Sequence, residues 1–183
     1  MPVQRLIPEH TALLVVDMQE KLMPLMHNAE RLVVQAGKMI DVAKALELPV
    51  LVTEQYRIGL GTTVQPLADR LDHAVCNHEK FKFSACTAPI RAELERLPSR
   101  CVIVCGIEAH VCILQSCLDL ADAGYVTAVV CDAIGSRREA DQQTAIQRLI
   151  QAGIVPITVE SAALELVREA GSTHFKAVLP IIR

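Results

Sequence analysis

The sequence predicts a three-layer α/β/α fold with a mainly parallel central sheet, and two observations carry this prediction. Short β-rich apolar segments alternate along the chain with longer segments of helical periodicity, an order that favours parallel strands joined by right-handed helical crossovers. The chain is 51% hydrophobic but only 3% aromatic, with no Trp. Its core must therefore be built from Val, Leu, Ile and Ala, as in Rossmann-like sheets covered on both faces. We expect one domain over residues 1–183, because this length suits a single core.

The individual elements follow from local patterns. The expected strands are residues 11–19, 49–55, 101–106, 125–136 and 154–160. Pro156 favours an edge or a bulge for the last of them. Helical periodicity covers residues 28–47, about 109–123 and 138–152, and the second and third of these helices end at Gly124 and Gly153. Ser161 is the expected N-cap of a further helix, and the Gly- and Pro-containing residues 56–70 are expected to form a loop.

Composition excludes several classes of protein. The net charge is −3 and no block of Lys or Arg occurs, so we expect no nucleic-acid partner. The first ten residues lack a signal-peptide pattern, and no apolar run approaches the roughly 20 residues of a membrane span. We therefore expect a cytoplasmic protein that is not bound to a membrane. The seven cysteines are an odd number without a Cys-x-x-Cys pair, which argues against a disulfide framework.

Ligand sites in such sheets form beyond the C-terminal ends of the strands, where Asp17 and Cys112 are placed. Cys112 follows the strand at 101–106 at the beginning of a helix, where free N–H groups favour a thiolate and can hold an oxyanion. Asp17 could accept the thiol proton, and either Lys80 or Lys82 could supply a cation. On the residues alone a structural interpretation is favoured, in which Asp17 caps a turn, Lys80 is solvated and Cys112 is packed.

Four stretches resemble the motifs of the isochorismatase-like cysteine hydrolases, a family that includes nicotinamidases. They are LLVVDMQ, EKFKFSA, CGIEAHVCI, and VVCDAIGS followed by Asp141, and they occur in the family's order. The likeness is strongest to the isochorismatase domain-containing hydrolases, through LPVLVTEQYRIGLGTTV, GIEAHVCILQSCLDL and THFK.

This resemblance implies a catalytic triad of Asp17, Lys80 and Cys112. The family's lysine stands three residues before the aromatic of its Tyr/Phe-Ser-Ala motif, which here begins at Phe83, so Lys80 matches and Lys82 does not. The resemblance also implies a cis peptide bond before Glu108, and an oxyanion hole formed by the backbone N–H groups of Glu108 and Cys112. It further implies a homo-oligomer, a dimer or larger.

The sequence departs from nicotinamidases at their metal site, which an Asp and several His form just after the second strand. Here that segment reads TEQYRIGLG, with Glu54 and no His before His73. We therefore expect no metal and no cofactor, and nicotinamide is a less favoured substrate. His73 and His78 are expected on the surface or in loops.

The expected function is that of a metal-independent cysteine hydrolase, which cleaves a small amide-like substrate through a Cys thioester. The alternative is a non-catalytic member of the same fold that serves as an oligomeric interaction protein. A dinucleotide-binding oxidoreductase is excluded because DMQEKLMP, after the first strand, has no Gly-x-Gly-x-x-Gly.

Several further residues have two interpretations each. Gln19, Gln55 and Tyr56 are candidates for the substrate pocket, with turn or loop contacts as the alternative. His110 could face the pocket or a neighbouring subunit, and we favour the subunit. Cys117 is expected in the core. Asp132 and Ser136 are expected to brace the loop that follows their strand.

Overall fold

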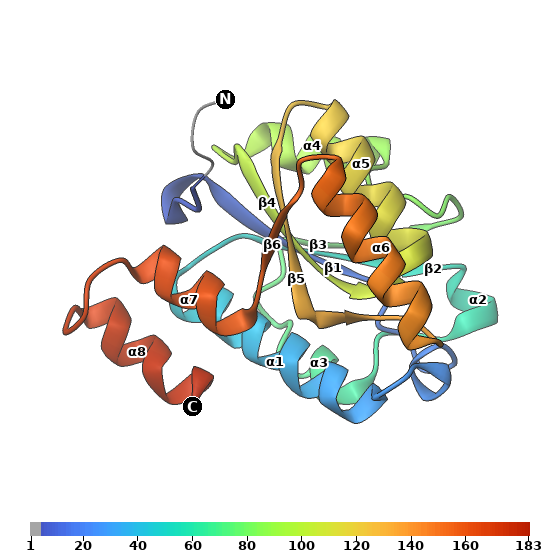
Figure 1. The fold of residues 1–183 in the computed structure, drawn as a ribbon, viewed down its shortest axis with the longest axis horizontal. Helices are drawn as coiled ribbons and strands as arrows, with labels where there is room; N and C mark the ends of the chain where they lie inside the picture. Colours follow the sequence, from blue (N-terminus) through green and yellow to red (C-terminus); the bar gives the residue numbers. More distant parts are fainter. Residues whose placement is uncertain (1–4) are drawn as a thin grey trace.

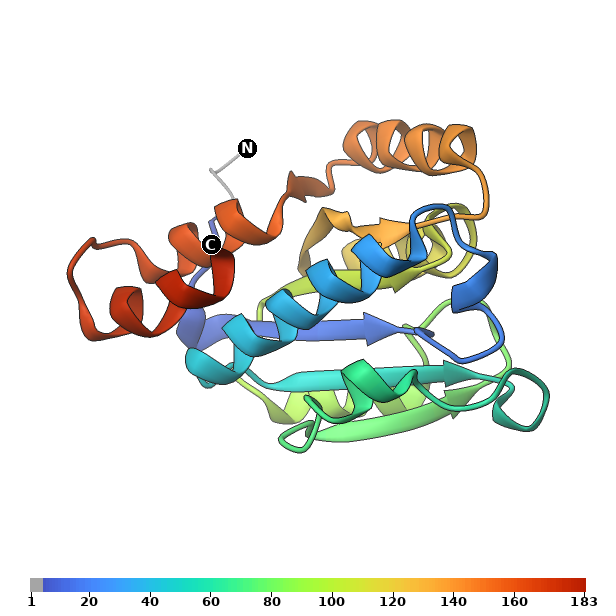
Figure 2. The ribbon, with the colours of Figure 1, turned by 90° about the horizontal axis from the view of Figure 1, so that it is seen from below.

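The computed structural model describes residues 5–183 and confirms the α/β fold, with a six-stranded, entirely parallel sheet of order β3-β2-β1-β4-β5-β6 (Figure 1). The strands are β1 (Thr11–Val16), β2 (Val50–Gln55), β3 (Cys76–Lys80), β4 (Cys101–Ile107), β5 (Val126–Gly135) and β6 (Val155–Ile157). Because all strands run the same way, their C-terminal ends meet at one edge of the sheet, as Figure 2 shows for β1 and β2.

Helices cover both faces of this sheet. One face carries α1 (Ala29–Ala45), α3 (Gln65–Ala68), α7 (Val159–Val167) and α8 (Thr173–Ile182). The other carries α4 (Ala88–Arg96), α5 (Leu114–Asp122) and α6 (Glu139–Gln151). The short helix η1 (Pro8–His10) precedes β1, and η2 (Met23–Leu25) and α2 (Arg57–Leu60) lie in connections. The π turn η3 (Ala109–Ile113) joins β4 to α5.

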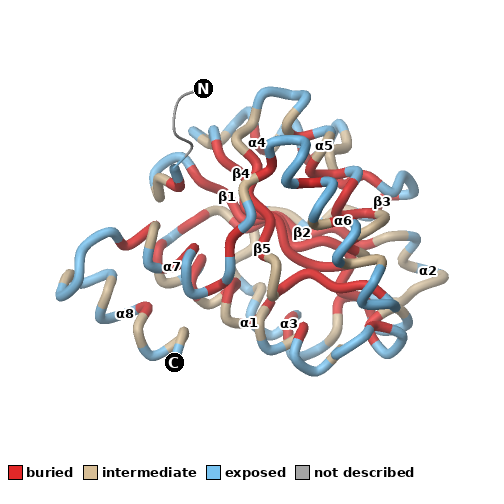
Figure 3. The backbone as a smooth tube through the Cα atoms, in the orientation of Figure 1, coloured by how far each residue is buried: buried red, intermediate tan, exposed pale blue. Residues whose placement is uncertain are grey.

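The central strands are buried throughout, as Figure 3 shows. In β1, Leu13 and Val15 pack under α1, while Leu14 and Val16 pack on the opposite face of the sheet. This burial on both faces explains why the strand reads as a continuous apolar run rather than as an alternating pattern. It also leaves the polar residue that follows, Asp17, at the end of a rigid strand.

The structure corrects the sequence prediction in five places. Strand β3 and the helices α4 and α8 were not predicted, and the expected loop at residues 56–70 contains α2 and α3. The sequence of β3, CNHEK, is polar because the strand lies at the edge of the sheet and pairs only with β2. The N-cap of α7 is Thr158, and Ser161 is its partner in a capping box. The prediction from Pro156 is confirmed, because β6 forms the other edge.

Gly106 brings the end of β4 against the end of β1. Its φ is +122°, and a Cβ atom there would lie 2.1 Å from the carbonyl oxygen of Val16.

We expect Gly106→Ala to lower the free energy of unfolding by at least about 2 kcal/mol, from backbone strain and steric overlap together. Urea unfolding measures this loss. Gly124→Ala is the control for strain alone, because Gly124 also has a positive φ but a Cβ atom there would meet no neighbouring segment within 4 Å. If both variants lost the same free energy of unfolding, the contact between Gly106 and the Val16 carbonyl would not be the cause of the loss.

Candidate active site

Asp17 follows β1 and is fully buried. Its φ of 53° lies in the left-handed region, which Asp tolerates better than most residues. The backbone N–H of Asp17 donates to the Thr53 carbonyl at 3.0 Å. Its carboxylate accepts one hydrogen bond from the Thr53 hydroxyl at 2.9 Å and another from Lys80 Nζ at 2.6 Å. Burial raises the pKa of this carboxyl, and the charge of Lys80 opposes that shift.

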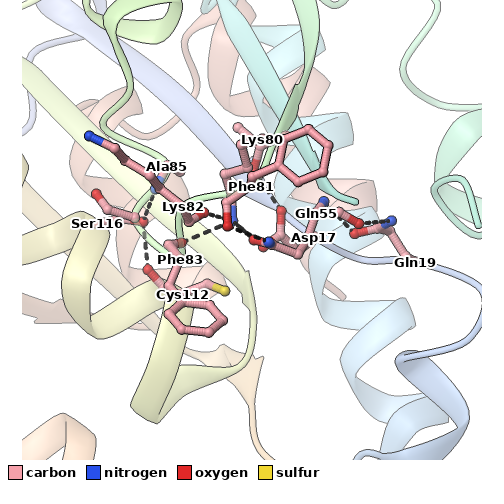
Figure 4. Close-up of polar contacts among 12 residues, drawn as sticks. Asp17, Gln19, Gln55, Lys80, Phe81, Lys82, Phe83, Ala85, Cys112 and Ser116 are labelled. Carbon is pink, nitrogen blue, oxygen red and sulfur yellow. Dashed lines mark hydrogen bonds and ion pairs between the residues drawn. The ribbon is translucent and has the colours of Figure 1, made fainter. Parts of the chain in front are cut away.

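Lys80 is the last residue of β3, and its ammonium group is surrounded by oxygen atoms (Figure 4). Besides Asp17, Nζ donates to Gln55 Oε1 at 2.7 Å and to the carbonyls of Phe83 and Lys82 at 2.9 and 3.2 Å. The Lys82 side chain is itself exposed. Spacing alone did not show which of the two lysines supplies the cation beside Asp17. In the structure Lys80 pairs with Asp17, and Lys82 contributes only its carbonyl to the contacts of Lys80.

Cys112 lies in η3 with 7% of its surface exposed. Burial raises the pKa of its thiol to about 12, the negative charge of Asp17 raises it further, and Lys80 acts in the opposite direction. The expectation of a thiolate at the helix N-terminus is therefore wrong for the resting protein. Loss of water around the sulfur favours the neutral thiol beside the Asp17–Lys80 pair.

The turn that carries Cys112 is wider than an α-helical turn. The Glu108 carbonyl accepts from the N–H groups of Val111 at 3.0 Å and Ile113 at 3.2 Å, which lie on either side of Cys112. The peptide bond Ile107–Glu108 is cis, as the resemblance implied. The Glu108 carboxylate points away toward Arg137 and accepts from its Nε at 3.0 Å. An oxyanion hole made of the Glu108 and Cys112 N–H groups stays a prediction.

The two glutamines at the rim make different contacts. Gln19 is fully buried, and its amide donates to the carbonyls of Gln55 at 2.9 Å and Gly61 at 2.6 Å while accepting from the Gln55 N–H at 2.6 Å. These are the turn contacts of the alternative interpretation. The Gln55 side chain binds Lys80, and Tyr56 is 47% exposed with its ring centroid 5.8 Å from that of Phe81. Substrate contact by Gln55 or Tyr56 stays a prediction.

Of the two residues expected to brace the loop after their strand, Ser136 contacts His110, whereas Asp132 lies within β5 and contacts α7 instead. His110 Nδ1 is hydrogen-bonded to the Ser136 hydroxyl at 2.9 Å, which ties η3 to the loop after β5. The Asp132 carboxylate accepts from the N–H of Val159 at 2.9 Å, so it caps α7. Cys117 is fully buried in the core, as expected.

Sequence reasoning missed Ser116, which is fully buried in α5. Its hydroxyl donates to the Cys112 carbonyl at 2.5 Å and accepts from the Ala85 N–H at 2.7 Å (Figure 4). The spacing of four residues from Cys112 was the available signal, because such residues are neighbours on a helix.

Glu54, in the segment where the resemblance to nicotinamidases would place a metal site, makes structural contacts. Both carboxylate oxygens of Glu54 accept hydrogen bonds, from Thr63 N and Oγ1 at 2.6 and 2.7 Å and from Arg57. Within residues 5–183, no three His, Cys, Asp or Glu side chains gather as a metal site would require. The expectation for His78 is corrected, because this histidine lies in β3, half-buried, and not in a loop. His73 lies in a loop and is also half-buried.

Comparison with known proteins identifies the family. Residues 11–161 match the Isochorismatase domain. The chain belongs to the isochorismatase family. It is 40% identical over 181 residues to isochorismatase domain-containing protein 2 of Macaca fascicularis, covering 98% of this chain and 86% of that protein. It is 38% identical over 183 residues to a secreted isochorismatase effector of Phytophthora sojae, covering 98% of this chain and 87% of that protein.

Solved structures agree with this assignment. One of a Caenorhabditis elegans protein, described as the MAR1 ribonuclease, superposes with a TM-score of 0.94 at 37% identity, covering 98% of this chain and 92% of that one. The ycaC gene product of Escherichia coli, described as an octameric hydrolase of unknown specificity, superposes with a TM-score of 0.87 at 25% identity, covering 98% and 93%. Within residues 5–183, no helix of this chain is long and apolar enough to cross a membrane.

Proposed function

We propose that this isochorismatase-family protein is a metal-independent cysteine hydrolase that cleaves a small amide-like C–N bond. The observation that carries the proposal is the buried ion pair between Asp17 and Lys80, 2.6 Å long, at the end of the sheet where both groups perturb the Cys112 thiol. Burying two charges is costly unless they are paired and hydrogen-bonded. A nucleophilic side chain beside a carboxylate that can accept its proton is one arrangement that supports covalent catalysis.

In the first half of the reaction, the Asp17 carboxylate takes the Cys112 proton while Sγ forms a bond to the substrate carbonyl carbon. The N–H groups of Glu108 and Cys112 hold the resulting oxyanion. The C–N bond then breaks, Asp17 gives its proton to the leaving amine, and the acyl group stays on Sγ as a thioester. The raised pKa of Asp17 suits this exchange, because a base with a higher pKa accepts a proton more readily.

In the second half, Asp17 takes a proton from water and the water oxygen attacks the thioester carbonyl. The C–S bond breaks, the acid product leaves, and the proton returns from Asp17 to the sulfur. The Lys80 ammonium group donates to four oxygen atoms, one of which belongs to Asp17. Its role is to hold the Asp17 carboxylate in place.

The chemistry favours carbonyl compounds over two other substrates. Isochorismate is a vinyl ether, whose hydrolysis does not call for an acyl thioester. RNA binding depends on cationic surface, whereas this chain has a net charge of −3 and a triad that is almost entirely buried. We propose small amides, carbamates and related carbonyls as the substrate class. We further propose a cytoplasmic homo-oligomer, a state that the octameric relative supports.

The test is a panel of small amides and carbamates scored by ammonia or amine release. We expect Cys112→Ala to lower turnover at least about a thousandfold, since removal of a catalytic nucleophile costs this much or more. Cys86→Ala removes a half-buried cysteine outside the triad and is the matched control. Intact mass spectrometry of Cys112-containing protein should show the acyl adduct with a slow substrate. Full turnover by Cys112→Ala would overturn the mechanism. A wild-type protein that neither turns over nor becomes acylated would favour the non-catalytic alternative.

A further inference from the structure

The triad residues come from three segments distant in sequence, and Ser116 connects two of these segments, that of Cys112 and that of Lys80. Cys112 lies on η3, while Lys80 ends β3 and is held by the backbone of the segment that follows. Two of the four oxygens around the Lys80 ammonium are the carbonyls of Lys82 and Phe83. The position of Lys80 relative to the thiol therefore depends on how residues 81–85 are docked against α5.

The Ser116 hydroxyl makes this connection with both of its hydrogen-bonding functions. It donates to the Cys112 carbonyl at 2.5 Å and accepts from the N–H of Ala85 at 2.7 Å. A serine in a helix commonly donates to the carbonyl four residues earlier. A second bond from the same oxygen to a backbone N–H of another segment has no such local explanation. Ser116 is fully buried, so water does not replace either partner.

We propose that Ser116 is a positioning residue that holds Cys112 in register with Lys80 and Asp17. The role rests on the proposed function of Cys112 as the nucleophile. It acts through the peptide of Cys112 and through Ala85, without contact to the substrate. A misplacement of about 1 Å in a catalytic group can cost a hundredfold in rate, so a link of two hydrogen bonds at this point has a measurable consequence.

Ser84 is the matched control in the same segment. It is also buried, but its hydroxyl accepts only from the N–H of Cys86, two residues later. Ser84→Ala therefore removes a buried hydroxyl from residues 81–85, which follow Lys80, without removing a hydrogen bond to η3. Ser116→Thr keeps the hydroxyl and is the conservative variant.

The experiment uses iodoacetamide as the probe, because it carries an amide and reports on the thiol without knowledge of the substrate. Alkylation rates of Cys112 and Cys86 are measured by peptide mass spectrometry from pH 6 to 9. The proteins compared are the wild type and the variants Ser116→Ala, Ser116→Thr and Ser84→Ala. In the wild type, we expect Cys112 to react faster than Cys86, with a pH dependence shallower than tenfold per unit, because Asp17 accepts the proton.

Ser116→Ala should lower the Cys112 rate at pH 7 at least about tenfold and steepen its pH dependence. Ser116→Thr should restore both features, and Ser84→Ala should keep the wild-type profile. If Ser116→Ala does not fold, Ser116→Cys replaces the hydroxyl by a weaker hydrogen-bonding group and should show the same change at smaller amplitude.

The outcomes separate the two proposals. A selectively reactive Cys112 with the same rate and pH profile in Ser116→Ala overturns the positioning role and leaves the proposed function standing. A wild-type Cys112 that reacts no faster than Cys86, with a tenfold rise per pH unit, overturns the proposed function and the positioning role with it. Equal losses in Ser84→Ala and Ser116→Ala would also overturn the specific role of Ser116.

Discussion

Lys80→Met should lower the free energy of unfolding by about 3–5 kcal/mol, the cost of leaving one member of a buried ion pair without its partner. The side chains of Lys80 and Asp17 are 1% and 0% exposed, so water does not compensate for the lost charge. The same variant should lose turnover. Without the Lys80 charge, burial raises the pKa of Asp17 further, so the carboxyl is protonated and cannot act as a base. Urea unfolding and amide hydrolysis on the same samples measure the two effects.

The double variant Asp17→Asn with Lys80→Met separates stability from catalysis. With no charge left to bury, it should recover most of the lost stability, as neutral replacements of buried ion pairs do. It should remain inactive, because neither side chain can then accept the thiol proton. A Lys80→Met protein as stable as the wild type would show that the pair is not buried in solution. Hydrolytic activity in the double variant would remove Asp17 from the mechanism.

Alkaline pH should destabilise the protein steeply, because its buried thiols must lose protons on unfolding. Burial raises the pKa of Cys101, Cys105 and Cys112 to about 12, from 9.0 for an ordinary thiol, and raises that of Cys117 as well. Between these values the folded state holds a proton that the unfolded state has released. The stability is therefore complete below pH 9 and falls as the pH rises toward 12, by about 1.4 kcal/mol per pH unit for each thiol.

Urea unfolding under reducing conditions at pH 8, 9 and 10 measures this slope. Cys105→Ala should reduce the loss of unfolding free energy per pH unit by the contribution of one thiol. The variant should also be less stable at every pH, because a buried side chain is shortened. Val104→Ala is the matched control: it lies beside Cys105 in β4, is equally buried and carries no titrating group. It should be less stable than the wild type with an unchanged slope. A wild-type stability that is constant from pH 8 to 10 would contradict the burial of these thiols.

Apolar patterning in the sequence was enough to predict the layers of the fold and the edge of the sheet where a site forms. Runs such as 11–16 and 101–107 are apolar on both faces, which is the pattern of inner parallel strands, and both are inner strands in the structure. Pro156 cannot donate to a neighbouring strand, which placed β6 at an edge. The sequence also indicated Asp17 and Cys112 as candidate site residues, because polar residues that follow buried strands gather at the C-terminal edge of a parallel sheet.

Three features depend on packing between segments that local sequence patterns do not describe. Strand β3 is polar and exists because it pairs with β2. That pairing puts Lys80 against Asp17, a choice that the family motif implied and that spacing alone left open. The state of the Cys112 thiol depends on the groups that exclude water from it, so a local rule about helix N-termini predicted the wrong direction of its pKa. Ser116 joins the cysteine turn to the lysine segment through Ala85. Periodicity encodes which face of a segment is buried, whereas these features depend on distances between segments that only packing brings together.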